Sequence, residues 1–261
     1  MNPQGTDKQE TDKPLVLIPV TAEDVAREKR RKVTIWVAAA IAVVLVALFS
    51  YRRMADPRDA REAYDAGLGL LKATRYEQAA LNFSRTIDLM PDYIEAHRLR
   101  GRVYVAQSNP DAAIRDFTKV LELNPQDSNA LVERGFAWLD KKSYANAFAD
   151  AVGAISVDAK MGRAYTLRAT ARRALGDAAK AVEDFTMAVG LEPNLENYFQ
   201  RASTYQLLGE QKLAIADFTN ALALDPSEPH LYFARAQARA ASGDARGAQE
   251  DIAAGRKIDG W

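Results

Sequence analysis

The segment IEAHRLRGRVYVAQSNPDAAIRDFTKVLELNPQD, residues 94–127, is one copy of a motif that the chain repeats. Its closing proline, Pro125, has counterparts at Pro91, Pro193 and Pro226, and the successive spacings are 34, 68 and 33 residues. Halfway through the 68-residue interval, Ala159 stands in the related stretch VDAKM. A fixed period in this range is the signature of a repeat architecture.

Alignment on these positions divides residues 60–261 into six units. They are 60–93, 94–127, 128–161, 162–194, 195–228 and 229–261. The eighth position of every unit is small (Gly67, Gly101, Gly135, Ala169, Ala202, Ala236), and the twentieth is always alanine (Ala79, Ala113, Ala147, Ala181, Ala214, Ala248). The twenty-fourth is mostly a large apolar residue (Phe83, Phe117, Ala151, Phe185, Phe218, Ile252). Small residues allow two helices to approach closely, and the large one fills the space between them.

Turn signals divide each unit into two helices. Gly176-Asp177, Gly209-Glu210 and Gly243-Asp244 fall at the fifteenth and sixteenth positions, where one helix must end and another begin. The pattern resembles the tetratricopeptide repeat family, whose period is 34 residues. The resemblance covers about 200 of the 261 residues and implies an all-α fold, a right-handed α-solenoid of six helix–turn–helix repeats.

The pattern departs from the family in two units. Ala151 and Ala159 replace the expected aromatic residue and proline in the third unit, and Gly255 and Gly260 replace alanine and proline in the sixth. We expect looser helix packing in both places.

A charged pair recurs beside the small residue. Position seven is arginine and the residue sixteen positions later is aspartate in five units, whereas the first unit has Ala66 and Asn82. The pairs are Arg100–Asp116, Arg134–Asp150, Arg168–Asp184, Arg201–Asp217 and Arg235–Asp251. Because both partners are present or absent together, we expect them to pair across the helices of one unit or between neighbouring units.

A second kind of segment precedes the repeats. Residues 33–51, VTIWVAAAIAVVLVALFSY, contain no charge, amide or imidazole and are bounded by Lys32 and Arg52. Nineteen residues give about 28 Å of helix, close to the ~30 Å hydrocarbon thickness of a bilayer. We therefore expect one transmembrane helix, flanked by a tail at 1–32 and a linker at 52–59. A cleaved signal peptide is the competing interpretation, although its apolar core is usually ~7–15 residues and its leader short.

Basic residues lie on both sides of this segment. Arg27, Lys29, Arg30, Arg31 and Lys32 precede it, and Arg52, Arg53, Arg58 and Arg61 follow it. The contiguous block before it favours a cytoplasmic N-terminus and a C-terminal domain outside the cytoplasm. Residues 1–20 are predicted to be a disordered tail. Within it, Leu15–Val20 is either a partner-binding linear motif or simply part of the tail. A helix is expected to begin after Thr21.

The resemblance also implies a binding surface. Tetratricopeptide arrays are protein-interaction scaffolds whose groove is lined mainly by positions two, five, nine, twelve and thirteen of each first helix. The groove residues implied here are Tyr64, Leu68, Arg98, Arg102, Val132, Phe136, Arg163, Thr166, Arg173, Phe199, Ser203 and Phe233. They suggest a peptide with apolar anchors and some acidic residues, while packing or solvation is the alternative at each position. Tyr64 and Leu68 stand where the carboxylate-clamp subtype has Lys and Asn, which argues against that subtype.

The amino-acid composition of the chain argues against several classes of function. The chain has 35 basic and 35 acidic residues, two His and no Cys. Because basic and acidic residues balance, the chain lacks the excess of positive charge that is typical of nucleic-acid binding. Because it has no Cys, thiolate and zinc–thiolate chemistry are excluded. No motif supports catalysis, so we predict no enzyme activity, no cofactor and no metal site. His97 is predicted to be a core residue and His230 a solvated one.

The expected function is therefore a membrane-anchored scaffold that recruits a protein partner. The predicted setting is a bacterial inner membrane with the repeats in the periplasm and a role in envelope complex assembly. The alternative is a cytosol-facing receptor or chaperone adaptor anchored by its N-terminus. Neither the partner nor the oligomeric state follows from the sequence.

Overall fold

In the computed structural model the described residues are 22–53 and 57–260, without the side chains of residues 22, 24, 25, 28 and 48–53. These residues form thirteen α-helices and no strand. Residues 1–54 and 55–261 are separate compact units. The predicted tail 1–20, with its Leu15–Val20 segment, Thr21 and residue 261 lie outside the described residues.

The described residues of the first unit, 22–53, form one helix. α1 (Ala22–Arg53) runs without a break through the basic segment and the predicted span 33–51. Its described apolar side chains between Val33 and Val46 are exposed. Among the helices that the structure describes, none is both long and apolar enough to cross a membrane. The end of the predicted span, residues 48–51, has no described side chains.

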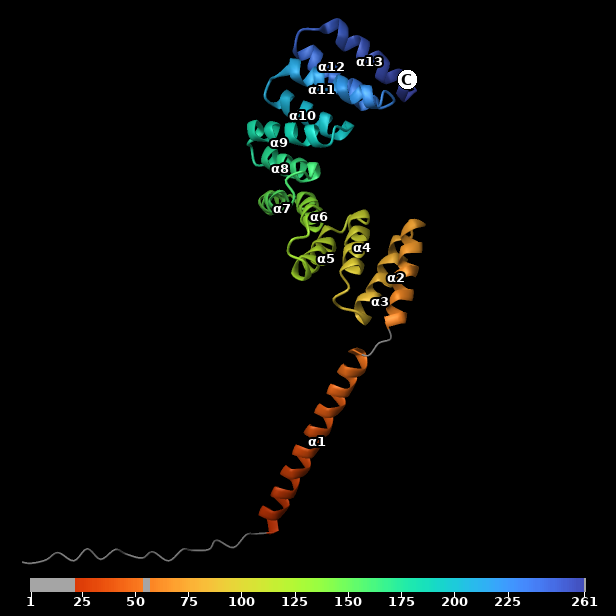
Figure 1. The fold of residues 1–261 in the computed structure, drawn as a ribbon, viewed down its shortest axis with the longest axis vertical. Helices are drawn as coiled ribbons and strands as arrows, with labels where there is room; N and C mark the ends of the chain where they lie inside the picture. Colours follow the sequence, from red (N-terminus) through yellow and green to blue (C-terminus); the bar gives the residue numbers. More distant parts are fainter. Residues whose placement is uncertain (1–21, 54–56, 261) are drawn as a thin grey trace, which may run out of the picture. The chain divides into compact units, whose positions relative to one another are not determined.

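The second unit is an all-α solenoid of helix pairs. Its helices are α2 (Pro57–Lys72), α3 (Tyr76–Leu89), α4 (Ile94–Ala106), α5 (Pro110–Leu123), α6 (Ser128–Asp140), α7 (Tyr144–Val157), α8 (Gly162–Ala174), α9 (Ala178–Leu191), α10 (Leu195–Leu207), α11 (Gln211–Leu224), α12 (Pro229–Ala241) and α13 (Ala245–Asp259). Each helix packs against the next one along the chain, so the pairs stack in sequence order (Figure 1). The first helices α4, α6, α8, α10 and α12 begin where the repeat units were predicted to begin, and α2 begins three residues before residue 60.

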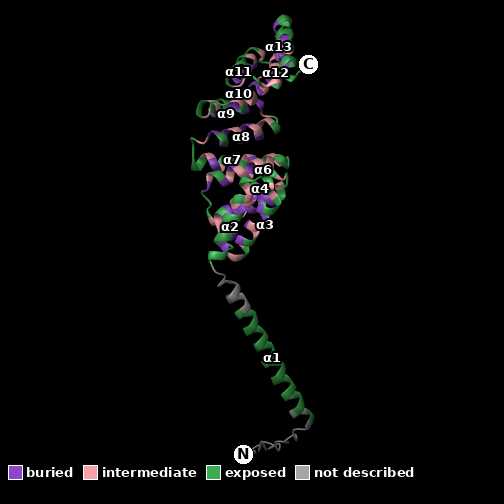
Figure 2. Cartoon of the chain, turned by 90° about the vertical axis from the view of Figure 1, so that its right-hand side faces the viewer, coloured by how far each residue is buried: buried purple, intermediate pink, exposed green. Residues whose placement is uncertain are grey.

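Close approach over a small residue explains the pairing of the first two repeats. A Cβ atom on Gly67 would lie 2.7 Å from the Phe83 ring, and one on Gly101 would lie 2.8 Å from the Phe117 ring. Both phenylalanines have no exposed surface. Such distances are too short for carbon atoms in contact, so only glycine permits this packing. Each helix from α2 to α13 contains buried residues (Figure 2).

The third repeat fills its core differently. Ala151 stands at the aromatic position, and the space over Gly135 is taken by Leu167 of the next repeat, which is fully buried. A Cβ atom on Gly135 would lie 2.3 Å from a Leu167 methyl group. The expected loosening of this repeat is therefore absent at this contact, because a neighbouring repeat supplies the side chain that the repeat lacks.

The sixth repeat also uses a glycine for close contact. A Cβ atom on Gly255 would lie 3.0 Å from the ring of Phe233. Here the glycine of α13 makes room for an aromatic residue of α12, so the departure from alanine accompanies a close contact rather than a gap.

The arginine–aspartate pairs tie the two helices of each repeat together. In all five, Nε and Nη2 donate to the two carboxylate oxygens at 2.7–3.0 Å, which is bidentate geometry. The aspartates are at most 6% exposed. Such charge-assisted, two-point bonds fix the relative position of the helices as well as their separation.

The same guanidinium groups reach the preceding repeat. Nη1 donates to a hydroxyl group in four of the five cases: Arg100 to Ser84, Arg134 to Thr118, Arg201 to Thr186 and Arg235 to Thr219. The arginines therefore make contacts both within one repeat and between neighbouring repeats. The carboxylate partner comes from the same repeat, and the hydroxyl partner comes from the preceding repeat. Val152 occupies the hydroxyl position for Arg168.

The buried histidine completes one of these networks. His97 is 5% exposed, as predicted for a core residue, and its ring nitrogens lie 3.2 Å from Asp116 Oδ1 and 2.9 Å from the carbonyl oxygen of Pro91. Burial alone raises the pKa of Asp116, but hydrogen bonds from Arg100 and His97 bring it below its ordinary value. His230 is half-exposed, also as predicted, and its ring meets that of Phe199 edge to face.

In each repeat, the residue at the fifteenth position, in the turn between the two helices, has a left-handed backbone conformation. The last three repeats place glycine there (Gly176, Gly209, Gly243), whereas the first three place Thr74, Ser108 and Lys142 at φ of 55–57°. Left-handed backbone costs a side-chain-bearing residue about 1 kcal/mol, so the first three turns are less favourable locally.

Removal of one buried carboxylate tests the pairing. Asp184 accepts bonds from Arg168 and from Arg172 Nη1, the latter at 2.8 Å. Asp184→Ala leaves two partly buried arginines without their anion, and we expect it to lower the free energy of unfolding by about 3 kcal/mol or more. Asp177→Ala is the control, because the side chain of Asp177 is 40% exposed and caps α9 without a buried partner. Equal urea midpoints for the two variants would show that the buried pair does not hold the helices together.

Candidate functional site

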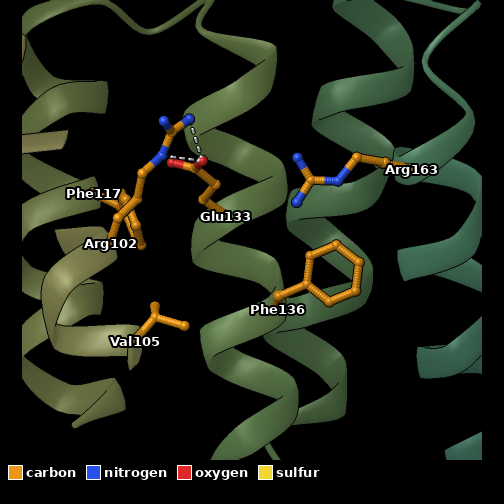
Figure 3. Close-up of a pocket in the computed structure, with 6 residues that line it drawn as sticks. All are labelled: Arg102, Val105, Phe117, Glu133, Phe136 and Arg163. Atoms are coloured by element: carbon orange, nitrogen blue, oxygen red, sulfur yellow. Dashed lines mark hydrogen bonds and ion pairs between the residues drawn. The ribbon is translucent and has the colours of Figure 1, made fainter. Parts of the chain in front are cut away.

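A hollow of about 400 Å³ opens among three consecutive first helices. Arg102 and Val105 come from α4, Glu133 and Phe136 from α6, and Arg163 from α8, while Phe117 of α5 lies behind them (Figure 3). Three of these residues, Arg102, Phe136 and Arg163, are among the predicted groove residues. The stacking that buries the core therefore also brings groove positions of three repeats to one place.

The charged end of the hollow contains two arginines and one glutamate. Arg102 Nε and Nη2 both lie 2.6 Å from Oε1 of Glu133. The second carboxylate oxygen, Oε2, is buried and has no hydrogen-bond partner. Glu133 thus neutralises Arg102 with one oxygen only.

Arg163 has a different environment. Its guanidinium carbon lies 5.7 Å from the centre of the Phe136 ring, a cation–π distance. Its backbone N–H donates to Glu192 Oε1 at 3.3 Å, but within residues 57–260 its guanidinium group has no carboxylate partner. Figure 3 shows Arg102, Glu133 and Arg163 toward one end of the hollow and Val105 and Phe136 toward the other.

Two further predicted arginines are held by residues that cap or belong to the next first helix. Arg98 forms a two-point ion pair with Asp127, at 2.7 and 3.2 Å, and its side chain is 14% exposed. Arg173 donates to the carbonyl oxygen of Gln200 at 3.3 Å, to the Gln200 side chain at 2.6 Å and to Thr204 at 3.2 Å. All three of its acceptors are neutral, and burial lowers the pKa of Arg173.

One predicted groove residue, Val132, belongs to the core instead, and two others are partly buried against the core. Val132 is 1% exposed and packs with Ala154 and Ala164, so its side chain does not line the groove. Tyr64 and Leu68 are partly buried against Phe83. Burial raises the pKa of the Tyr64 hydroxyl. Val132 is buried because Ala154 of its own repeat and Ala164 of the next repeat pack against it.

The remaining predicted residues lie farther along the solenoid. Thr166 donates to Asn197 Oδ1 at 2.8 Å, and Phe199 packs against Phe218. Phe233 is 37% exposed. Ser203 lines a second hollow of about 340 Å³, whose other lining residues are Gln206, Leu207, Gln211, Gln237 and Ala241. The second hollow has no charged lining residue, so it differs chemically from the first.

The comparisons with known proteins identify the repeats. Residues 98–159, 162–195 and 195–228 match the tetratricopeptide repeat family. These segments are tetratricopeptide repeats. Serine/threonine-protein phosphatase 5 of Rattus norvegicus is 32% identical over 100 residues, which are 38% of this chain and 20% of that protein. The chain spans less than a third of the length of the first curated relatives it matches.

Solved structures share the tetratricopeptide fold. The structure of pilF from Pseudomonas aeruginosa superposes with a TM-score of 0.66 at 18% identity, over 77% of this chain and 93% of that one. YrrB, a tetratricopeptide repeat protein with an unusual peptide-binding site, superposes with a TM-score of 0.55 at 19% identity, over 67% and 91% of the two chains. At this level of identity the similarity establishes the fold.

Two lining residues were not predicted from the tetratricopeptide pattern. Val105 holds position twelve of its repeat, one of the groove positions, and its side chain is 41% exposed. Glu133 holds position six, which is not a groove position, and only its pairing with Arg102 brings it to the hollow. Among the residues that the structure describes, no group of three metal-ligating side chains occurs.

The pair between Arg98 and Asp127 predicts a pH effect. Although burial raises it, the hydrogen bond from Arg98 and the backbone N–H of Ala130 hold the pKa of Asp127 below its ordinary value of 3.8. A carboxyl group whose pKa is lowered by folding stabilises the protein above its ordinary pKa, and this stabilisation is lost as pH falls through the folded-state pKa. We expect the urea midpoint to fall between about pH 5 and pH 3, and to fall less in Asp127→Asn. An identical fall in both proteins would contradict this role of Asp127.

Proposed function

We propose that this protein is a membrane-anchored scaffold that binds a peptide or partner helix of another protein in the groove formed by the first helices of its repeats. The observation that carries the proposal is the hollow among α4, α6 and α8, where apolar and cationic side chains of successive repeats converge. A concave row of helices suits an extended peptide or a helix, because neighbouring repeats present the same positions at regular intervals.

The comparisons support a protein-interaction scaffold in general terms. The matched family consists of tetratricopeptide repeats, and one structure with the same fold is described as having a peptide-binding site. The partly buried Phe136 ring and the exposed Val105 side chain offer an anchor for an apolar side chain, and the arginines of the hollow offer cations to an acidic one. We infer a non-catalytic role, since the described groove presents ion pairs and packing contacts rather than a nucleophile beside a base.

The membrane part of the proposal rests on the sequence of residues 33–51 and its flanks. This stretch is uncharged, and a block of basic residues precedes it directly. Under the positive-inside rule the N-terminus would be cytoplasmic and the repeats would lie in the periplasm of a bacterial inner membrane, where they would serve envelope complex assembly. A cytosol-facing receptor or adaptor is the alternative if the orientation is reversed.

The orientation is tested by reporter fusions after residue 261. One reporter is active only outside the cytoplasm and the other fluoresces only inside it. We expect signal from the outside reporter and recovery of the fusion with membranes, because the basic block precedes the apolar stretch. Deletion of residues 33–51 is the control and should release the fusion from membranes. Signal from the inside reporter would favour the receptor or adaptor, and a membrane-free parent fusion would refute anchoring.

Partner binding in the groove is tested by site-specific photocrosslinking in cells. A photoreactive phenylalanine analogue replaces Val105, whose side chain is 41% exposed at the hollow. The same analogue at Arg115, exposed on the second helix α5, is the control. We expect a crosslinked protein at position 105 and none at 115. Equal crosslinking at both positions would indicate that the groove has no special role.

A further inference from the structure

The two arginines at the hollow differ in how far their charges are compensated. Arg102 is paired with Glu133, whereas the guanidinium group of Arg163 has no carboxylate partner among residues 57–260 and rests on the Phe136 ring. An arginine over an aromatic face keeps its donors free at its edge. Arg163 is therefore the cation of the hollow that is ready to pair with an anion.

Glu133 is an unusual partner for Arg102. Its side chain is only 10% exposed, and its Oε2 atom is buried without a hydrogen-bond partner. A buried carboxylate with an unsatisfied oxygen is costly, and the aspartates of the repeat pairs show no such defect, since both of their oxygens accept bonds. The pair of Arg102 and Glu133 joins α4 to α6, and both residues line the hollow.

The other end of the hollow is apolar. Val105 is 41% exposed, and Phe136 and Phe117 also line the hollow. A hollow of about 400 Å³ is within the range that binds a small ligand or one large side chain. Phe136 of α6 and Arg163 of α8 lie on adjacent first helices, so neighbouring residues of one peptide can reach both.

We propose that this hollow binds a peptide through one large apolar side chain, seated between Val105 and Phe136, and an adjacent acidic residue that pairs with Arg163. Glu133 sets the charge preference by neutralising Arg102, so that the site accepts one acidic residue rather than a cluster. The inference rests on the proposed peptide-binding function and specifies the ligand of that groove. An acidic partner follows from charge complementarity, because the net charge contributed by Arg102, Glu133 and Arg163 is positive.

The role of Glu133 has a distinct consequence. Glu133→Gln keeps the shape of the side chain but removes its charge, which leaves Arg102 available as a second cation. The variant should prefer peptides with two acidic residues, and its binding should depend more steeply on salt. A purely structural glutamate would change stability without changing the preference for charge.

The test is a selection from a phage-displayed library of random dodecapeptides. The bait is the full 261-residue chain in mild detergent, as wild type, Arg163→Glu and Glu133→Gln, each checked for folding by its thermal unfolding curve. The matched controls are Arg115→Glu and Glu183→Gln, which make the same charge changes at exposed positions of second helices. The most enriched wild-type peptide is then synthesised, and its Kd is measured with each protein by fluorescence anisotropy.

We expect wild-type and control baits to enrich a large apolar residue next to one acidic residue. Arg163→Glu should weaken the synthetic peptide about tenfold or more, and Arg163→Gln should weaken it less. Glu133→Gln should select additional acidic residues and bind a doubly acidic version at least about threefold more tightly than wild type does.

Three outcomes overturn the inference, and only the last of them also overturns the proposed function. Enriched peptides without acidic residues, or a Kd unaffected by Arg163→Glu, would refute the charge preference while leaving peptide binding intact. Failure of folded wild-type protein to enrich any peptide would refute both.

Discussion

The close approach of two helices over one small residue is the constraint on which the rest of the solenoid depends. Gly67 and Gly101 leave room for the rings of Phe83 and Phe117, and no larger residue fits at those distances. A helix pair packed in this way still exposes apolar faces on both sides, which only neighbouring repeats can cover. The stack therefore forms as a consequence of the pair, and the groove forms as a consequence of the stack.

Arginine serves three purposes in this chain, and its partner distinguishes them. The position-seven arginines pair with buried aspartates, and four of the five also donate to a hydroxyl group of the preceding repeat, so their charges stabilise the repeat framework. Arg98 pairs with Asp127, which caps α6, and Arg102 pairs with Glu133 of α6, so both pairs join α4 to α6. Arg163 is compensated by no carboxylate within residues 57–260 and stacks on Phe136. We therefore expect ligand binding at an arginine that lies outside the regular arginine–carboxylate pairs, such as Arg163.

Much of the framework could be predicted from the sequence because it repeats. The small, alanine and aromatic positions recur at fixed offsets, and the helices α4, α6, α8, α10 and α12 begin at the predicted unit starts. The arginine–aspartate pairs were foreseen because both partners vary together. Local spacing determines these features, and the same local geometry recurs in each repeat.

Residues whose environment could not be predicted from their position in the repeat are those that contact side chains of a neighbouring repeat. Leu167 fills the space left by Ala151, and Val132 is buried in part by the following repeat, although its position suggested the groove. Glu133 enters the hollow only through its contact with Arg102. None of these follows from a position number, since each depends on which side chain a neighbouring repeat presents. The predicted span at 33–51 is a separate matter, because it rests on an uncharged stretch rather than on repeat geometry.

A crystal structure of the protein with its selected peptide would test the central claim most directly, which is that the first helices form the binding surface. The account predicts an apolar peptide side chain between Val105 and Phe136, with a peptide carboxylate within hydrogen-bonding distance of Arg163. A peptide bound along the second helices, or one whose carboxylates all point away from Arg163, would contradict it.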